Sequence, residues 1–478
     1  MKKSTGVIGV VVVLGVAYLG ATWYVGKEAQ KTIEHAVAQA NTRLARYLGP
    51  DTDGGVKIGI ADYQRGFFSS DVVYTVHMKD PDGKPLDLAL HDHLQHGPFP
   101  LSALQAGYVA PLLAYSRARL AATPATQAWM DSQKGESPLN VETRVGFGGS
   151  GHSVWTFSPT ELAEDGDTLS FSGGAISIDF GKDFNSSSAT GQFDSFSLAN
   201  TQTGESLRIE NIRLDSKTDI GDESSMQVHS SATADTLTMD NAKDEAVAIE
   251  KLAIKLDNVQ TGDILDGALR YDFGRIAVGP MDLGSLSLGV RANRLDVAAL
   301  SALAGEYDAI QLRHGGQDDQ DLVLSDDEER VLREKLMAVL ASDPSVAIEQ
   351  LVWKNVDGQS KASLRVDLTR PADTDEKNAD VLLTQALKQV QLDFSLLKPM
   401  FIGVFGQAQA DPQQRLQMEM MGAMIYDQYM ARLQGAGLVR VDGDTAASSV
   451  LYENNGVTVN GQAMSVTEFM QRVLSVAM

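Results

Sequence analysis

The chain contains no cysteine. This absence excludes disulfide bonds, thiolate nucleophiles and metal sites built on cysteine ligands. Basic residues are also scarce, because 40 lysines and arginines stand against 63 aspartates and glutamates, for a net charge of −23. Such a surface repels phosphate backbones, so we expect no nucleic-acid partner.

Recognisable catalytic motifs are missing as well. The sequence has no G-x-S-x-G nucleophile motif and no G-x-x-x-x-G-K-[ST] phosphate loop. No dinucleotide fingerprint stands between a predicted strand and a predicted helix, and "GFGGSGHS" (146–153) is predicted to be a loop or hairpin tip. We therefore expect a protein that is not an enzyme and that carries no cofactor.

Only one long apolar run is present. Residues 4–26 carry no charge, follow Lys2 and Lys3, and end near Trp23 and Tyr24. A helix of this length spans a bilayer, and the flanking lysines predict that its amino end stays in the cytoplasm. The alternative is a cleaved signal peptide with its cleavage site near Ala17, but the run is longer than a usual signal core. We expect residues 1–26 to be an uncleaved membrane anchor, with the rest of the chain exported from the cytoplasm.

Residues 27–50 are predicted to form an amphipathic helix. Its apolar positions are spaced as in a coiled-coil heptad: Ile33, Val37, Ala40, Leu44 and Tyr47. Two heptads are too few to establish a coiled coil, so two interpretations remain open. The helix either lies on its own domain or forms the stalk of a homodimer.

Residues 51–300 are predicted to be rich in β-strands. Apolar and polar residues alternate with a period of two, as in strands with one buried and one solvated face. The alternation slips at Glu210-Asn211 and again at Glu250-Lys251, which suggests β-bulges. A helical insert is expected over residues 101–119 and again around residues 127–133.

Residues 301–478 are predicted to be mixed α/β, completing the same sheet or forming a second lobe. Ser325 and Glu328 form a capping box at the start of one helix, and Asn455-Gly456 signals a hairpin turn. The expected fold class is α+β, in which the transmembrane helix precedes a large, curved antiparallel meander with helices packed on one face.

The stretch "HDHLQH" (91–96) holds three of the eight histidines. It resembles the His-x-His-x-Asp-His run of metallo-hydrolases, but Gln95 replaces the required acid. In a strand, His91 and His93 point away from the face that carries Leu90 and Leu94, and a metal site needs three or four converging ligands. We expect a solvated strand face and no metal site, with a metal-dependent envelope hydrolase as a remote alternative.

A methionine-rich segment is the best candidate for a hydrophobic contact surface. One interpretation is a packed helix, and the other is an adaptable surface that meets lipid, protein or a second subunit. Together with the apolar segment before it, this candidate surface comprises Phe401, Phe405, Met418, Met420, Met421, Met424 and Met430.

Five short segments resemble landmarks of one family. They are "YQRGFFSS" (63–70), "HGPFPL" (96–101), "KGESPL" (134–139), "FSGG" (171–174) and "VTVNGQAMS" (457–465). In this order, behind an apolar amino end, they resemble the YdgA-like proteins, which form domain-of-unknown-function family 945 of proteobacteria. The resemblance implies an inner-membrane protein facing the periplasm, with a homodimer as one possibility, and it implies no activity.

The landmark turn of this resemblance comprises His96, Gly97, Pro98, Phe99 and Pro100. We expect a rigid exit from a strand there, with Phe99 filling the core.

The expected function is non-enzymatic binding of a hydrophobic client in cell-envelope maintenance. The client would be a lipid, a lipoprotein or an unfolded envelope protein. The alternative is a dimeric structural or interaction scaffold in the envelope, motivated by the heptad spacing.

Overall fold

The structure is a computed structural model, and it describes most of the chain beyond residue 55. The described residues are 37, 38, 41, 56–66, 69–79, 83–96, 99–221, 225–241, 245–314, 324–372, 379–407 and 411–477. Contacts between Cα atoms divide the chain into two units, and the division runs through β12 (Ser225–Asp240). Its residues Val228–Asp235 belong to unit 1 and Thr236–Thr238 to unit 2.

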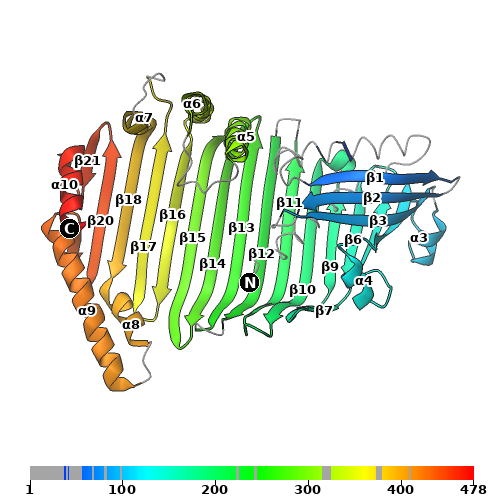
Figure 1. Ribbon diagram of the computed structural model, residues 1–478, viewed down its shortest axis with the longest axis horizontal. Helices are drawn as coiled ribbons and strands as arrows, with labels where there is room; N and C mark the ends of the chain where they lie inside the picture. The colour runs from blue at the N-terminus through cyan, green and yellow to red at the C-terminus, as the bar shows by residue number, and fades with distance from the viewer. Residues whose placement is uncertain are drawn as a thin grey trace. The chain divides into compact units, whose positions relative to one another are not determined.

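Unit 1 is an antiparallel sheet in which β1 to β6, β9, β10 and β11 pair in that order (Figure 1). A short hairpin, β7 and β8, pairs with the second half of β10. The strands are β1 (Lys57–Arg65), β2 (Ser69–Lys79), β3 (Pro85–His96), β4 (Ala114–Ala121), β5 (Leu139–Val145), β6 (Gly151–Phe157), β7 (Thr160–Glu164), β8 (Asp167–Phe171), β9 (Gly174–Phe180), β10 (Ser186–Asn200) and β11 (Ser206–Ile220). Its helices are α3 (Leu101–Gln105), α4 (Gln127–Ser132) and the 3-10 turn η2 (Lys182–Phe184).

The core of unit 1 is closed. Alternate residues of β2 are buried, Val72 and Val76 being at most 1% exposed, and they pack in one cluster with residues of β3 to β6 and β9. Trp155 on β6 lies in the same cluster, also 1% exposed. The strict alternation that the sequence predicts therefore produces fully buried side chains here.

One residue of the predicted amphipathic helix joins this core. Val37 is helical and 8% exposed, and it packs in the cluster of unit 1. The side chain of Asn41 exchanges two hydrogen bonds of 2.8 Å with the backbone of Ile58 on β1. These contacts favour the interpretation in which the helix lies on its own domain. The other heptad positions lie outside the described residues.

Unit 2 is a second antiparallel meander, in which β13 to β18 pair in chain order and β18 then pairs with β20. β20 also pairs with β19 and β21, and β21 pairs with β22. The strands are β13 (Val247–Thr261), β14 (Ile264–Val278), β15 (Met281–Asp296), β16 (Ser345–Asn355), β17 (Gly358–Leu368), β18 (Leu387–Leu397), β19 (Arg440–Asp442), β20 (Thr445–Glu453), β21 (Gly456–Val459) and β22 (Gln462–Ser465).

The helices of unit 2 lie where its strands end. α5, α6 and α7 are at one end of the strands and α8 is at the other (Figure 1). α9 follows α8, and α10 packs on β21 and β22. Their bounds are α5 (Val297–Arg313), α6 (Asp326–Leu340), α7 (Ala379–Ala386), α8 (Lys398–Gln407), α9 (Pro412–Gly435) and α10 (Val466–Ala477).

Both predicted changes in the phase of the alternation are present. Neither comes from an extra residue that lacks a partner on the neighbouring strand. Asn211 and Lys251 adopt φ angles of 53° and 54° in the middle of their strands. The register of β11 to β10, and of β13 to β14, continues past them without an offset. A single left-handed residue thus reverses which face the next side chain occupies, so the prediction of β-bulges at these positions is wrong in mechanism.

The large antiparallel sheet with helices, expected from the sequence, is confirmed as a fold class. The predicted helix over residues 101–119 is mostly wrong, because only α3 is helical and β4 begins at Ala114. The boundary predicted at residue 300 falls inside unit 2. The predicted division of the chain into domains stays a prediction. The predicted transmembrane segment, residues 4–26, lies outside the described residues.

Candidate functional site

Three rows of apolar side chains cross the sheet of unit 2. Because the strands are in register, residues of one face align from strand to strand. The first row is Leu256, Leu269, Val290, Ile348, Leu364, Leu392 and Val450. The second is Ile254, Tyr271, Leu288, Leu351, Ala362 and Phe394, and the third is Leu252, Phe273, Leu286 and Trp353. We call this surface the apolar face.

The apolar face is not buried as the core of unit 1 is. Every residue in the three rows retains some solvent exposure, and Leu392 is 37% exposed. At the usual spacing of strands, a row of seven residues is roughly 29 Å long. The face is therefore a long apolar strip that the described residues cover only in part.

Helices cover this face at its margins. Met400 on α8 is fully buried, and its Sδ accepts a hydrogen bond from Ser360 at 3.3 Å. Tyr426 on α9 packs on Phe394 and Leu396, while Val450 and Tyr452 share a cluster with α10 residues. No residue in the middle of the face, from Leu269 to Leu364, belongs to a core cluster among the described residues.

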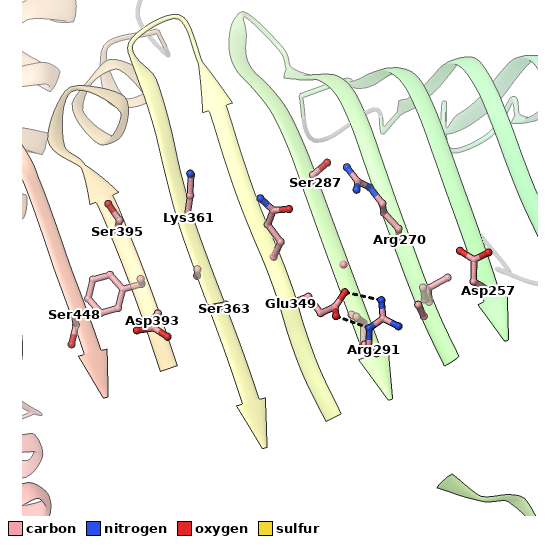
Figure 2. A pocket seen from close by; sticks show the side chains of 17 residues that line it. Asp257, Arg270, Ser287, Arg291, Glu349, Lys361, Ser363, Asp393, Ser395 and Ser448 are labelled. Carbon is pink, nitrogen blue, oxygen red and sulfur yellow. Dashed lines mark hydrogen bonds and ion pairs between the residues drawn. The ribbon is translucent and has the colours of Figure 1, made fainter. Parts of the chain in front are cut away.

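The opposite face of the same strands is polar and hollowed. A cavity of about 650 Å³ is lined by side chains from β13 to β18 and from β20 (Figure 2). Arg291 and Glu349 form an ion pair there, drawn as dashed lines in Figure 2. Ser287, on the same strand as Arg291, and Lys361, on β17, also line the cavity.

Asp272, on the polar face near this cavity, is held in its charged form. Partial burial opposes the charge, but hydrogen bonds from Arg270 and Ser287 outweigh it and lower the pKa of the carboxyl. Arginine and carboxylate side chains thus neutralise each other on this face, which leaves a hydrated polar surface.

The methionine-rich candidate surface divides into two sides. Phe401 packs on Phe405 and Tyr426, with ring centroids 5.0 and 5.8 Å apart. Met430 packs in the same cluster, and Met418 is half-buried.

The other side of α9 faces solvent. Met420 and Met424 are 66% and 64% exposed, Met421 is 39% exposed, and Leu416 continues the exposed stripe one turn earlier. Of the seven candidate residues, these three methionines are the most exposed, Phe401, Phe405 and Met430 contribute to the packing of α8 and α9, and Met418 is half-buried.

The histidine-rich stretch forms the second half of β3. His91 and His93 point to solvent while Leu90 and Leu94 are buried, so the predicted orientation is confirmed. Nδ1 of His93 lies 2.7 Å from the carboxylate of Asp71 on β2. In the part of the chain that the structure describes, no three metal-ligating side chains lie together.

The landmark turn is only partly described. β3 ends at His96 and α3 begins after Pro100, whereas Gly97 and Pro98 lie outside the described residues. Phe99 is 55% exposed, so the expectation that it fills the core is wrong. The core below is already filled by β-strand residues such as Leu94, which leaves no need for a side chain from the turn.

Asp92 is a residue that the sequence analysis missed. It is 3% exposed and accepts a hydrogen bond of 2.7 Å from Ser116 on β4. Burial raises the pKa of this carboxyl to about 7. The signal was present in the sequence, because Asp92 has the same parity as Leu90 and Leu94 in an alternating strand.

A serine–histidine–aspartate arrangement also escaped the sequence analysis. His152 on β6 bonds to Asp179 at 2.8 Å through Nδ1, and Ser177 lies 3.5 Å from its Nε2. Acyl transfer also requires donors for the oxyanion, and the backbone N–H groups of these strands are used in the sheet. The geometry is therefore that of a cross-strand hydrogen-bond group.

Comparison with known protein families shows which family this chain belongs to. The family described as "Bacterial protein of unknown function (DUF945)" matches residues 1–467. The chain belongs to the DUF945 family. The resemblance drawn from the five short segments is thereby confirmed.

Two curated relatives match the chain from end to end. Protein YdgA of Escherichia coli strain K12 is 26% identical and aligns over 98% of this chain and 96% of its own length. The uncharacterized protein YihF of the same strain is also 26% identical, over 98% of both chains. No solved structure matches the chain significantly. Membership of DUF945 brings no known activity with it.

The helices that the structure describes include none with the length and apolarity to cross a membrane. The predicted anchor of this DUF945 chain, residues 4–26, is outside that part of the chain.

Proposed function

We propose that this protein is a non-enzymatic binding protein of the bacterial cell envelope, held in the inner membrane by residues 4–26, with the remaining chain in the periplasm. Its client is hydrophobic: a lipid, a lipoprotein or an unfolded envelope protein. The observation that supports this most is the apolar face of unit 2, whose three rows remain partly exposed in the described structure.

A client that covers the apolar face removes its side chains from water, which is favourable. Full burial of an exposed leucine or valine side chain contributes roughly 1.5–3 kcal/mol. Because the side chains of the apolar face are already partly buried, a client that covers one of them gains a fraction of that free energy. A row of seven such residues offers enough partly exposed apolar area to hold an elongated client without any specific polar contact. The strands beneath it, from β14 to β18, are each paired on both sides, so binding requires little ordering of the backbone.

The exposed stripe of α9 supports the same function. Methionine side chains are flexible and polarizable, so they adapt to clients of different shape. Leu416, Met420 and Met424 lie one turn apart on the solvent side of α9. We propose that this stripe provides further apolar contacts for the client.

Site-specific photocrosslinking of the full chain in cells tests the proposal. A photoreactive phenylalanine analogue at Leu288 or Leu351 points from the apolar face, whereas the same analogue at Ser287 or Val352 points from the polar face of the same strands. We expect the first pair to crosslink to lipid or to an envelope protein and the second pair to give no such product. Equal crosslinking from both faces, or none from either, would contradict client binding on the apolar face.

Mass spectrometry of the gently purified full chain identifies the client class. A co-purified lipid or bound polypeptide supports the carrier function. Crosslinks between two copies of the chain, with no other molecule bound, would instead support the dimeric scaffold.

A further inference from the structure

The exposed apolar side chains of unit 1 gather on two connections between its strands. One connection, residues 97–113, joins β3 to β4, and the other, residues 146–150, joins β5 to β6. Exposed fractions range from 40% for Leu104 to 76% for Val109. Before residue 239, the large apolar side chains that the structure describes as exposed are Phe99, Leu101, Leu104, Val109 and Phe147. We call these five residues the apolar tip.

The two connections leave the same end of the sheet. The last residue of β3, His96, pairs with Ala114 at the start of β4, and Ala114 pairs with Val145 at the end of β5. The N–H of Leu113 donates a hydrogen bond of 2.8 Å to the carbonyl of Val145. α3, which follows β3, lies beyond this end of the strands (Figure 1). The fold thus brings two segments that are separate in the chain to one place.

Packing beneath the tip holds it in position. Ala103, Leu112 and Tyr115 are buried in a small cluster, and Tyr108 packs against them. The guanidinium of Arg144 lies over the ring of Tyr108, 4.4 Å from its centroid. The exposed side chains therefore project from a loop that has a core of its own, and a group of exposed apolar side chains on an ordered surface marks a contact site.

Charge is absent from both connections. Residues 97–113 and 146–150 contain no aspartate, glutamate, lysine or arginine, although the chain has a net charge of −23. The connection between β9 and β10, which leaves the same end, adds one charge of each sign, Lys182 and Asp183. The tip is therefore an uncharged surface on a strongly acidic protein.

Behind the tip, the outward face of the strands carries charges of both signs. Glu142 on β5 lies directly across from Arg117 on β4. Asp71 on β2 bonds to His93 on β3 at 2.7 Å. What distinguishes the tip from the surface behind it is thus apolar area and not charge.

We propose that the apolar tip inserts into the boundary between the headgroups and the acyl chains of a lipid bilayer. Phenylalanine and leucine are side chains with which membrane-surface elements enter this boundary, to a depth of about 5–10 Å. A charged side chain at that depth is costly, which agrees with the lack of charge in both connections. The inference rests on the proposed membrane anchor, because the anchor keeps unit 1 at the membrane.

The composition of the tip favours a bilayer over a protein partner. Protein interfaces surround an apolar centre with a polar rim, and charges of opposite sign across the rim fix the orientation of the partner. The two connections have no charge with which to do so. Anionic headgroups repel an acidic chain, so its uncharged end is the part that approaches a bilayer most closely.

The length of chain after the predicted anchor permits this contact. The apolar run ends at Gly26, and Val37 lies in the core of unit 1 eleven residues later. Asn41 bonds to Ile58, and β1 runs from there to Arg65, roughly 23 Å away at the end that carries the tip. Eleven extended residues span at most roughly 40 Å. The chain is therefore long enough for the anchor and the tip to enter one bilayer.

Depth-dependent fluorescence quenching in the full-length protein tests the insertion. Because the chain has no cysteine, Val109→Cys introduces a single labelling site at the most exposed residue of the tip. The labelled chain is reconstituted in phosphatidylcholine vesicles that carry a nitroxide quencher near the start of the acyl chains. We expect strong quenching that persists at high salt, because screening does not weaken an apolar contact.

A second labelling site provides the matched control. Ala128→Cys places the same fluorophore on α4, which follows β4 at the other end of the strands. When the tip is inserted, the length of β4 holds this label roughly 23 Å from the bilayer, so we expect no quenching there. Replacing half of the phosphatidylcholine with phosphatidylglycerol should not strengthen quenching at residue 109, because the chain is acidic.

Charged substitutions identify the side chains that insert. Leu101→Asp/Phe147→Asp is expected to lower the inserted fraction at least about tenfold, because insertion would desolvate two carboxylates. The matched control is Val356→Asp, in the turn between β16 and β17, where the side chain is 93% exposed and quenching should be unchanged. If the double variant fails to fold, Phe147→Ser alone removes one exposed ring and should weaken insertion about threefold.

Several outcomes would overturn the proposal. They are equal quenching at residues 109 and 128, quenching that requires phosphatidylglycerol, and unchanged quenching in a folded Leu101→Asp/Phe147→Asp variant. A change in the emission of the label at residue 109 in native membranes, without one in protein-free vesicles, would overturn the bilayer as the partner and indicate an envelope protein instead.

Failure of the anchor is distinguished separately. An alkaline wash of cell membranes shows whether the chain is integral. If it is not, the same labelled chain is mixed with preformed vesicles, and the same contrast between labelling sites and variants then decides whether the tip inserts.

Discussion

The two units use the same alternation of apolar and polar residues with different results. In unit 1, residues such as Val76 and Leu94 have no exposed surface, because the strands β1 to β6 and β9 contribute to one shared core. In unit 2, Leu288 and Leu351 occupy equivalent positions in their strands but remain partly exposed. The alternation therefore specifies a strand with two faces, and the elements packed on it determine whether the apolar face becomes a core or a binding surface.

Two aspartates give the largest expected difference between the units. The pKa of Asp92 in the native state is about 7, above the unfolded value of 3.8, so between these pH values the native state retains a proton that the unfolded state has lost. Stability is therefore expected to fall as pH rises through this window, by on the order of 4 kcal/mol at most, and to stay level above it. Asp92→Asn should remove this dependence and stabilise the protein at about pH 8.

The matched change in unit 2 is expected to act in the opposite direction. The pKa of Asp272 is lowered in spite of partial burial, because Arg270 and Ser287 hydrogen-bond to it. Asp272→Asn should therefore cost stability at neutral pH and none below the native pKa of the carboxyl. Urea unfolding of the wild type and Asp92→Asn between about pH 4 and pH 8, and of the wild type and Asp272→Asn between about pH 5 and pH 2, measures the two slopes of stability against pH. Slopes of equal sign would contradict the difference in environment between the two carboxyl groups.

The second comparison deletes the same side chain from each unit. Leu94→Ala leaves a cavity in the closed core and is expected to cost about 3 kcal/mol of unfolding free energy. Leu288→Ala should cost about 1 kcal/mol, because water already reaches that position. Chemical denaturation of each variant gives both values. Similar losses at the two positions would show that the apolar face is as well covered as the core.

The third comparison introduces a charge. Leu351→Asp on the apolar face should fold and lose client binding about tenfold, since a carboxylate in the complex must be desolvated. Val76→Asp in the core of unit 1 should prevent folding, because the charge would be fully buried. The amount of client crosslinked at Leu288 measures the first effect, with Val352→Asp on the polar face as the control. A Leu351→Asp variant that retains its client would exclude the apolar face as the site.

The smallest expected effect concerns the polar face. Arg291→Gln removes the ion pair with Glu349, and we expect less than about 1 kcal/mol of lost stability because water screens both groups. Client crosslinking should be unchanged. Thermal unfolding and the crosslinking assay check both expectations, and a large loss in either would assign the polar cavity a role that its paired charges do not suggest.

Local features were predicted well from the sequence. The capping box of Ser325 and Glu328 is present at the start of α6, and the loop 146–150 joins β5 to β6 as a hairpin tip. The hairpin near Asn455 is also confirmed, although its turn consists of Asn454 and Asn455, both with positive φ, and Gly456 begins β21. Asparagine tolerates the left-handed conformation, which moves the turn by one residue.

Features that depend on neighbouring strands were predicted less well. Residues 114–119 were expected to be helical, but they pair with both β3 and β5 as part of β4. Ladder hydrogen bonds on both sides and burial of Ala114, Ala118 and Leu120 outweigh their helix propensity. The exposure of Phe99 was missed for the same reason, because its surroundings come from elements distant in the chain.

Residue type and spacing along the chain were enough to predict most of the strands and their two faces, the helix caps and membership of the DUF945 family. Packing between elements determines that core leucines of unit 1 such as Leu94 are buried, whereas Leu288 and Leu351 of unit 2 are partly exposed. It also places Asp92 beside Ser116. Register between strands and the cover over each face depend on residues far apart in the sequence, and the period of a single strand carries no information about them.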